Sequence, residues 1–334
     1  YEDPNEDHGI YGMVMPTVPV TFKAVKVLNG RPNGAWTEKD KYVADITPLN
    51  NAPKSAVPSS ITFTDNKTQT VRINTGAFTK EGSYQYEVKE RKGDNAGVTY
   101  DDRVWILTVT VTDDLTGQLQ AQTRVNTAYP TTFTNTYQTK PVSVQFRAHK
   151  TLNDPDHTGI QLQAGQYEFK CVEDKTGGQV GTVKTNDQQG NILFDTISYT
   201  KTGVYDYTLS EVHGDNGGIT YDATKHHVKV TVTDNGEGQL LSDVKYDDGT
   251  NIPEFTNPYK AQPATDNPTA MKKMTFSKGN KYTLKGGDFN FTLHQQSAPA
   301  NVRNEDQTKR NDQQGNIRFD QLSFPLVGTY VYTM

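Results

Sequence analysis

The sequence predicts an all-β protein made of tandem immunoglobulin-like β-sandwich domains, with a third copy that is truncated. Apolar and polar residues alternate strictly in LTVTVTDD (107–114) and in VKVTVTDN (228–235), which is the period of a half-buried strand. The turns GDNAG (93–97) and GDNGG (214–218) supply residues that adopt positive φ between short strands. Several short strands with turn signals between them favour a β-sandwich.

An internal repeat organises the chain. The matched asparagines Asn135 and Asn257 lie 122 positions apart (257 minus 135), so the repeating unit has the size of a domain. A third copy begins near residue 268, and its NDQQGNIRFDQLSF (311–324) matches NDQQGNILFDTISY (186–199) of the second copy. We expect a linker or disordered end at 1–15, a first repeat at 16–138, a second at 139–260 and an incomplete third at 261–334.

Composition excludes several classes of function. The net charge of -5 without clustered Lys and Arg argues against a nucleic-acid partner. No apolar run approaches the length of a membrane span, so we expect no membrane insertion in this segment. No signal peptide or wall-sorting signal is visible, which indicates an internal fragment or mature portion if the protein is exported. We find no nucleophile elbow, phosphate loop or zinc spacing, so we expect no enzyme acting on an external substrate and no cofactor.

Cysteine and histidine usage points to packing. The single cysteine, Cys171, aligns between repeats with Ile46 and Leu293, which predicts a small buried hydrophobic residue and no reactive thiol. His226 and His227 are neighbours on a strand and therefore point to opposite faces, so we expect no metal site there.

Three polar residue types recur at fixed places in both complete repeats. A lysine lies in the first strand, a glutamate ends a middle strand, and an asparagine lies in the last strand. Counting the alternation of each strand places all three on its apolar, inward face, where Lys and Glu are rare unless they are paired. The residues are Lys26, Glu90 and Asn135 in the first repeat, and Lys150, Glu211 and Asn257 in the second.

Two interpretations of these triads remain open from the residues alone. The simpler is a buried Lys–Glu ion pair with a nearby asparagine. The other is chemistry: burial lowers the pKa of a lysine and makes its amine nucleophilic. The glutamate would shuttle protons while the amine attacks the asparagine carbonyl, and loss of ammonia would leave an amide between the two side chains.

Four motifs occur in the same order in both repeats, namely G-x-Y-x-Y-x-[VL]-x-E, G-[VI]-T-Y-D, V-T-V-T-D and F-T-N-x-Y. Together they resemble the streptococcal pilin isopeptide-linkage domain of FctA-type major pilins and of tandem repeats in Gram-positive surface proteins. The resemblance implies a collagen-adhesin B-type fold with a spontaneous Lys–Asn isopeptide bond assisted by a glutamate. It implies a bond from Lys26 to Asn135 assisted by Glu90, and one from Lys150 to Asn257 assisted by Glu211.

In the third copy the resemblance puts Lys272 in the place of the nucleophile, with Lys273 as the alternative alignment. The matching glutamate and asparagine would lie beyond Met334, so we expect no bond within this copy.

The function expected from this resemblance is structural. The repeats would form the stalk of an extracellular, wall-anchored adhesin or pilus-like protein whose anchor lies outside this chain, with neighbouring repeats as partners. Two alternatives stay open: a module that binds a host glycan or an extracellular matrix protein, and a subunit of a polymerised pilin shaft.

Overall fold

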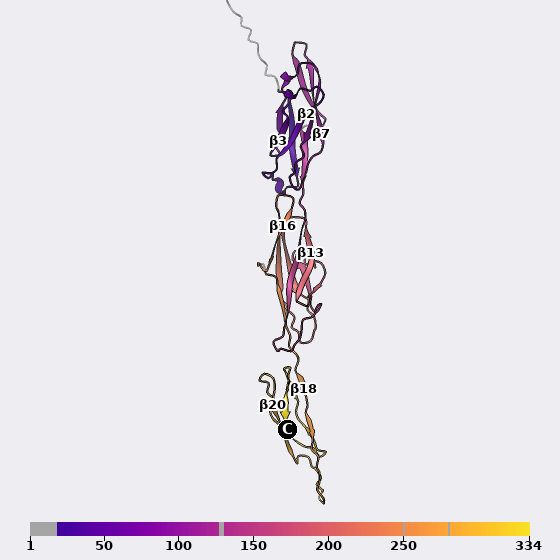
Figure 1. The fold of residues 1–334 in the computed structure, drawn as a ribbon, viewed down its shortest axis with the longest axis vertical. Helices are drawn as coiled ribbons and strands as arrows, with labels where there is room; N and C mark the ends of the chain where they lie inside the picture. Colours follow the sequence, from indigo (N-terminus) through magenta and orange to yellow (C-terminus); the bar gives the residue numbers. More distant parts are fainter. Residues whose placement is uncertain (1–18, 127–129, 250, 280) are drawn as a thin grey trace, which may run out of the picture. The chain divides into compact units, whose positions relative to one another are not determined.

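A computed structural model describes residues 19–126, 130–249, 251–279 and 281–334 (Figure 1). The linker expected at 1–15 lies outside the described residues. Within the described ranges, the regular structure is β-strand except for three short 3-10 turns, η1 (Pro32–Gly34), η2 (Lys54–Ala56) and η3 (Thr75–Ala77). The predicted all-β fold of tandem β-sandwich domains is therefore confirmed. No helix in the described part of the chain is long and apolar enough to cross a membrane.

Contacts between Cα atoms divide the chain into two compact units. Among the described residues, unit 1 comprises 19–126, 130–142, 199–202 and 233–241, and unit 2 comprises 143–198, 203–232, 242–249, 251–279 and 281–334.

Unit 1 contains the first β-sandwich, which consists of two sheets. One sheet has the strand order β4-β1-β9-β6, in which β1 and β9 run parallel. The other sheet has the order β3-β2-β5-β7-β8 and is antiparallel. The strands are β1 (Thr21–Asn29), β2 (Tyr42–Pro48), β3 (Ser60–Phe63), β4 (Gln69–Arg72), β5 (Gly82–Glu90), β6 (Val98–Thr99), β7 (Val104–Asp113), β8 (Leu119–Val125) and β9 (Thr131–Tyr137).

Alternate side chains of these strands point inward and fill the space between the two sheets. Every second residue of β1 from Phe22 to Leu28 is buried, and Tyr86, Val88 and Glu90 of β5 are buried in the same manner. Leu107 and its alternate neighbours on β7 complete the opposite wall. The inward faces counted from the sequence are therefore the faces that the core uses.

The second β-sandwich repeats this plan. One sheet has the order β13-β10-β17, with β10 and β17 parallel, and the other has the order β12-β11-β14-β15-β16. The tip of the β15–β16 hairpin, Tyr199–Thr202 at the end of β13 and the first residue of β10 belong to unit 1, and the rest of this sandwich belongs to unit 2. The strands are β10 (Val142–Asn153), β11 (Glu168–Glu173), β12 (Lys184–Thr185), β13 (Asn191–Tyr199), β14 (Gly203–Glu211), β15 (Lys225–Asp234), β16 (Leu240–Tyr246) and β17 (Glu254–Pro258).

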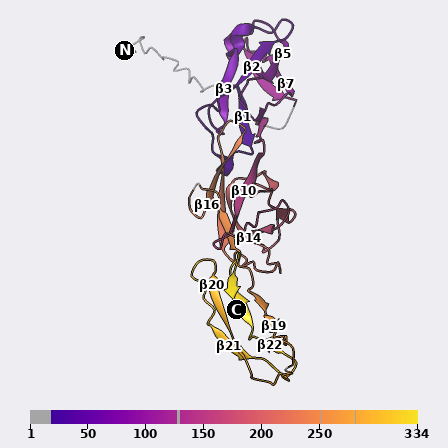
Figure 2. The same ribbon diagram turned by 60° about the horizontal axis from the view of Figure 1, so that its bottom comes forward.

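The last segment of unit 2 has shorter sheets, with β18 beside β23, β19 beside β22, and the order β21-β20-β24 (Figure 2). Its core is small, formed by Leu293, Ile317, Phe319 and Leu322. The strands are β18 (Ala264–Asp266), β19 (Thr269–Met271), β20 (Asn290–Ser297), β21 (Gln307–Arg310), β22 (Asn316–Arg318), β23 (Leu322–Phe324) and β24 (Val331–Thr333).

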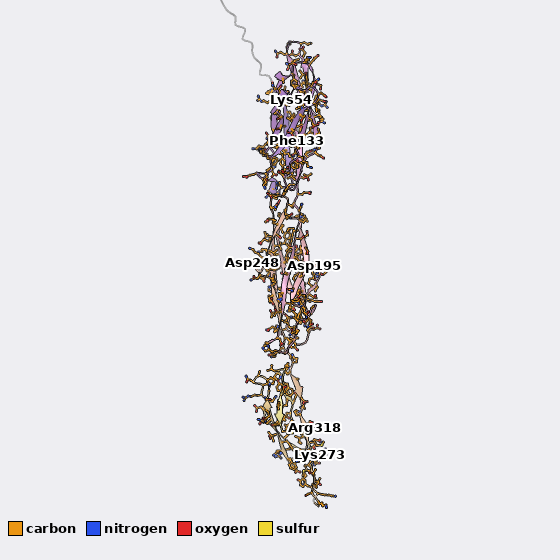
Figure 3. The ribbon with its side chains drawn as sticks, in the orientation of Figure 1. Lys54, Phe133, Asp195, Asp248, Lys273 and Arg318 are labelled. Carbon is orange, nitrogen blue, oxygen red and sulfur yellow. The ribbon has the colours of Figure 1, made fainter. Side chains whose placement is uncertain are left out.

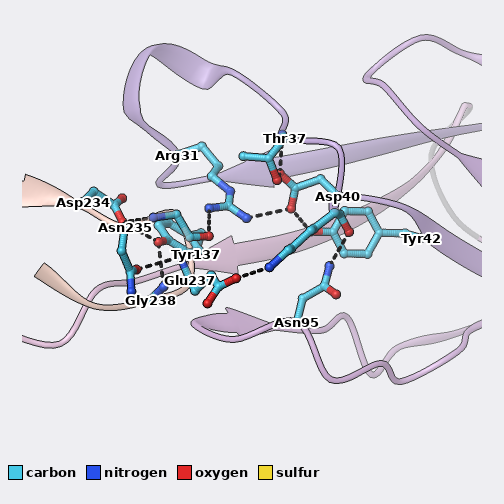
Figure 4. A network of polar contacts seen from close by, with 12 residues as sticks. Arg31, Thr37, Asp40, Tyr42, Asn95, Tyr137, Asp234, Asn235, Glu237 and Gly238 are labelled. Carbon is cyan, nitrogen blue, oxygen red and sulfur yellow. Dashed lines mark hydrogen bonds and ion pairs between the residues drawn. The ribbon is translucent and has the colours of Figure 1, made fainter.

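Within unit 1, the tip of the β15–β16 hairpin packs on one end of the first sandwich (Figure 4). Tyr137 Oη donates to Asp234 Oδ1 at 2.7 Å and accepts from the backbone N of Gly238 at 2.8 Å. Arg31 lies over the Tyr137 ring, 3.8 Å from its centroid, and donates to the Gly236 carbonyl at 2.7 Å. We call this contact the hairpin clasp.

Candidate functional site

The lysine and asparagine of the first triad come from neighbouring parallel strands. In the β1–β9 pair, Lys26 lies opposite Phe133 and Asn135 lies opposite Leu28. Lys26 and Asn135 are thus diagonal neighbours, and both side chains point into the sandwich because residues two apart on a strand share a face. Both residues are fully buried.

Glu90 reaches the same place from the opposite sheet, as the last residue of β5. Its Oε2 accepts from Lys26 Nζ at 2.7 Å, and its Oε1 accepts from Asn135 Nδ2 at 2.9 Å. One carboxylate therefore holds both the amine and the amide, each through a separate oxygen.

The second triad has the same geometry on β10, β14 and β17. Lys150 lies opposite Phe255 and Asn257 lies opposite Leu152 in the parallel β10–β17 pair. Lys150 Nζ lies 3.0 Å from Glu211 Oε1 and 3.1 Å from its Oε2, and Asn257 Nδ2 donates to Oε1 at 2.8 Å. Two copies with different surrounding sequences thus arrive at one arrangement.

Burial controls the electrostatics of both lysines. Loss of water lowers the pKa of Lys26 and Lys150, while the hydrogen bond and the charge of the paired glutamate act in the opposite direction. The pKa of each lysine stays below its ordinary value because desolvation is the larger effect. A lowered pKa increases the fraction of the amine that is neutral, and the neutral form is the nucleophile.

An aromatic ring accompanies each lysine, a feature that the sequence analysis missed. Lys26 Nζ lies 5.1 Å from the ring centroid of Tyr42, and Lys150 Nζ lies 4.7 Å from that of Tyr167. Tyr42 and Tyr167 occupy matching positions in the repeats, YVADI (42–46) and YEFKC (167–171). The recurrence of an aromatic residue at this position in both repeats is the feature of the sequence that could have indicated a ring beside each lysine. The rings exclude water from the amine and favour its charged form through the π face, so only the first effect promotes nucleophilicity.

In the third segment, Lys272 is half-buried and has some of the contacts that Lys150 has. Lys272 Nζ lies 4.6 Å from the ring centroid of Phe289, which matches Tyr167 in the repeat. The backbone N of Lys272 donates to Gly315 at 2.7 Å, as that of Lys150 donates to Gly190 at 2.7 Å. Lys273 is exposed (Figure 3). Lys272 therefore shares with Lys150 a backbone hydrogen bond to a glycine carbonyl and an aromatic ring near its amine.

The other candidate residues have structural contacts. Cys171 is buried, and this burial raises the pKa of its thiol to about 12. His226 packs edge-on against Phe255, and its Nδ1 lies 2.7 Å from Asp247 Oδ2. Within the described ranges, no group of three or more His, Cys, Asp or Glu residues is arranged to hold a metal ion.

Comparison with known families gives one match that covers most of the chain. The sequence profile of FctA, described as the Spy0128-like isopeptide containing domain, matches residues 22–138, 146–260 and 268–334. A search of curated proteins found no match.

Solved structures with likeness to this chain include pilins and adhesin repeats. The T-13 major pilin of Streptococcus pyogenes is 17% identical, with 72% of this chain and 98% of that chain covered and a TM-score of 0.31. The two B repeat units of the Staphylococcus aureus collagen binding protein are 14% identical, with 95% and 68% covered and a TM-score of 0.25. The SpaE basal pilin of Lactobacillus rhamnosus GG is 12% identical, with 72% and 99% covered and a TM-score of 0.21.

Proposed function

This chain belongs to the family of Spy0128-like isopeptide containing domains, and we propose that its repeats are stalk units of a Gram-positive surface protein, each complete repeat closed by a Lys–Asn isopeptide bond. The family supports a structural role of the pilin or surface-protein type. The observation that carries the finer proposal is the buried triad, in which one glutamate contacts both the lysine amine and the asparagine amide in two repeats.

The proposed reaction needs only these three side chains. The neutral Nζ of Lys26 attacks Cγ of Asn135, so that a Cγ–Nζ bond forms and the Cγ–Nδ2 bond breaks. One proton passes from Nζ to Nδ2 through the Glu90 carboxylate, which already contacts both nitrogens, and ammonia leaves. Lys150, Asn257 and Glu211 would react in the same way.

The position of the bond suggests a mechanical purpose. It would join the first strand of a repeat to the last, and these strands are parallel neighbours. Force entering along β1 would pass through the bond into β9, and the 108 residues between Lys26 and Asn135 (27–134) would be bypassed. Such a bond also resists reductants, which suits an extracellular chain with a single cysteine.

Tandem repetition within one chain favours a stalk over a polymerised shaft, and the partners of each repeat would then be its neighbours. Covalent polymer ladders in wall extracts of the producing cells would support the shaft instead. A single-sized band at the mass of the parent protein would support the stalk.

The first experiment is the intact mass of the denatured chain, compared with the mass calculated from its sequence. We expect a deficit of two ammonia molecules, one for each complete repeat. The double variant Asn135→Ala with Asn257→Ala should show no deficit, which controls for other losses of ammonia. A wild-type chain at its full calculated mass would overturn the proposal, and a single deficit would confine it to the repeat that peptide mapping identifies.

A further inference from the structure

The repeated Tyr-Asp element brings a backbone N–H to the side-chain carbonyl of each candidate asparagine. The backbone N of Asp101 donates to Asn135 Oδ1 at 2.8 Å, and the backbone N of Asp222 donates to Asn257 Oδ1 at 2.8 Å. Each N–H is shared, because the backbone N of Asp101 also donates to Glu90 Oε2 at 3.1 Å and that of Asp222 also donates to Glu211 Oε2 at 2.9 Å. Both repeats thus present a main-chain donor inside the triad.

This donor fixes which way each asparagine amide points. A carboxylate can only accept and a backbone N–H can only donate, so Nδ2 of Asn135 must face Glu90 and Oδ1 must face Asp101. Nδ2 is the atom that leaves as ammonia, and it lies against the group that would supply its proton. Oδ1 is the atom that gains negative charge when an amine adds to Cγ.

We propose that the backbone N–H groups of Asp101 and Asp222 are the oxyanion donors of the cross-linking reaction, each stabilising the charge that develops on the asparagine Oδ1 during attack by the lysine. The proposal rests on the proposed function, since it names a further group in that reaction. A preorganised donor aimed at a developing oxyanion in a water-excluded site stabilises the transition state more than the ground state.

The carboxylate of the same aspartate holds the donor in position. Asp101 Oδ2 accepts from the backbone N of Thr134 at 2.7 Å, and Asp222 Oδ2 accepts from that of Thr256 at 2.8 Å. Thr134 and Thr256 directly precede the asparagines. Each aspartate therefore ties its own main chain to the strand that carries the reacting amide.

The two repeats hold the aspartate carboxylate in place through different contacts. Arg103 donates its backbone N to Asp101 Oδ1 at 3.0 Å and its Nε to the same atom at 2.9 Å. The matching residue in the second repeat is Thr224, whose backbone N donates to Asp222 Oδ1 at 2.9 Å. The arginine contacts therefore occur in the first repeat and not in the second. The hydrogen bond from the aspartate N–H to the asparagine Oδ1 occurs in both.

A backbone change that removes only the donor tests the proposal. Cell-free translation with a suppressor tRNA that carries malic acid replaces Asp101 by its α-hydroxy analogue, which turns the N–H into an ester oxygen and keeps the side chain. Samples quenched in denaturant at intervals give the fraction of cross-linked peptide for each repeat by mass spectrometry. The second repeat of the same chain is the internal control.

We expect the ester at position 101 to slow cross-linking of the first repeat roughly a hundredfold, in line with the loss of one oxyanion donor, and to leave the second repeat at its wild-type rate. An ester at position 222 should reverse this pattern. Hydrogen exchange of the β1 and β9 amides shows whether the first repeat is folded at the assay temperature. If the ester at 101 unfolds that repeat, the ester at 222 decides the question.

Wild-type rates in both ester chains would overturn the proposal while the cross-link itself stood. Absence of cross-links from the wild-type chain would instead overturn the proposed function, so the two failures are distinguishable.

The role of the Asp101 carboxylate in positioning the donor has its own test. Asp101→Ala keeps the N–H and removes its anchor, so the rate should fall, and Asp101→Asn, which retains an acceptor for Thr134, should recover part of it. Equal rates for the alanine and asparagine variants would show that the carboxylate does not position the donor.

Discussion

Lys26 and Glu90 form an ion pair inside the first sandwich, with Nζ 2.7 Å from Oε2 and only 0% and 2% of the two side chains exposed. Removing two charges from water costs several kcal/mol for each ion, and a single ion pair does not by itself add net stability. The pair in the second repeat has both side chains at 0% exposure. Such burial in both repeats is explained if the pair serves a reaction that needs a dry amine beside a carboxylate.

The role of the glutamate gives the first prediction. Glu90→Gln keeps the shape of the side chain but removes its ability to pass a proton, so the first repeat should stay unlinked and the mass deficit should fall to one ammonia. Denatured intact mass with peptide mapping measures this. Glu87→Gln, on the same strand with its side chain on the outward face, is the matched control and should keep both deficits. A cross-linked first repeat in the Glu90→Gln chain would remove the glutamate from the mechanism.

Unfolding free energies distinguish the contribution of the isopeptide bond from that of the Lys26–Glu90 ion pair. Asn135→Ala loses the bond that closes a loop of 109 positions (135 minus 26), which by analogy with a disulfide costs about 4–5 kcal/mol of unfolding free energy. Lys26→Ala loses the same bond and also leaves the charge of Glu90 buried without its counter-charge, which adds about 3–5 kcal/mol. Chemical unfolding of the two variants should therefore rank Lys26→Ala as the less stable. Equal stabilities would mean that the carboxylate of Glu90 finds water or a proton once the lysine is gone.

Much of this site could be predicted from the sequence because alternation is a local property. Counting along the strands put Lys26, Glu90 and Asn135 on inward faces, and the repeat supplied each observation twice. The sequence pattern did not predict that β1 and β9 are parallel neighbours, because strand order depends on contacts across the whole domain.

The donor at Asp101 could not be predicted for a related reason. Its contribution comes from the backbone N–H, which every residue except proline carries, so no residue type marks it. Only the path of the chain after β6 brings that N–H to Asn135. The Tyr-Asp repetition marked the position, and the structure supplied the contact.

Acid should weaken the first repeat through Asp101. Burial would raise the pKa of this carboxyl, but hydrogen bonds from Arg103 and Thr134 outweigh burial and lower it to about 2. Because the folded pKa lies below the ordinary value, the stabilisation is complete above about pH 4 and is lost as the pH falls through about 2. The shift corresponds to about 2 kcal/mol.

Calorimetric melting temperatures from pH 5 to pH 2 check this prediction. The difference between wild type and Asp101→Asn should shrink as the pH falls. Asp102→Asn, at the exposed neighbouring position, should not change the pH profile. A gap between wild type and Asp101→Asn that stays constant down to pH 2 would show that Asp101 has an ordinary pKa.

In the hairpin clasp of unit 1, the backbones of Gly97 and Gly238 approach each other closely. A Cβ at Gly238 would lie 2.7 Å from the Cα of Gly97, and the residue has a φ of +78°. Gly236 in the same hairpin has a φ of +76°, yet a Cβ there would meet nothing within 4 Å. Gly236→Ala should therefore cost only the strain of a left-handed residue, about 1 kcal/mol. Gly238→Ala adds a clash between two backbones, which cannot rotate away as a side chain can.

Hydrogen exchange gives the readout for this pair of variants. The amide of Lys140 donates to the Gly238 carbonyl at 2.8 Å, and that of Leu240 donates to Lys140 at 3.1 Å, so both report directly on the clasp. We expect Gly238→Ala to speed exchange at these two amides at least tenfold, while Gly236→Ala leaves them close to wild type. The β5 and β7 amides should keep their protection in both chains, because the sandwich core does not involve the hairpin tip. Equal exchange in the two variants would mean that the close approach of Gly97 and Gly238 does not hold the clasp shut, and that Tyr137 and Arg31 hold it without them.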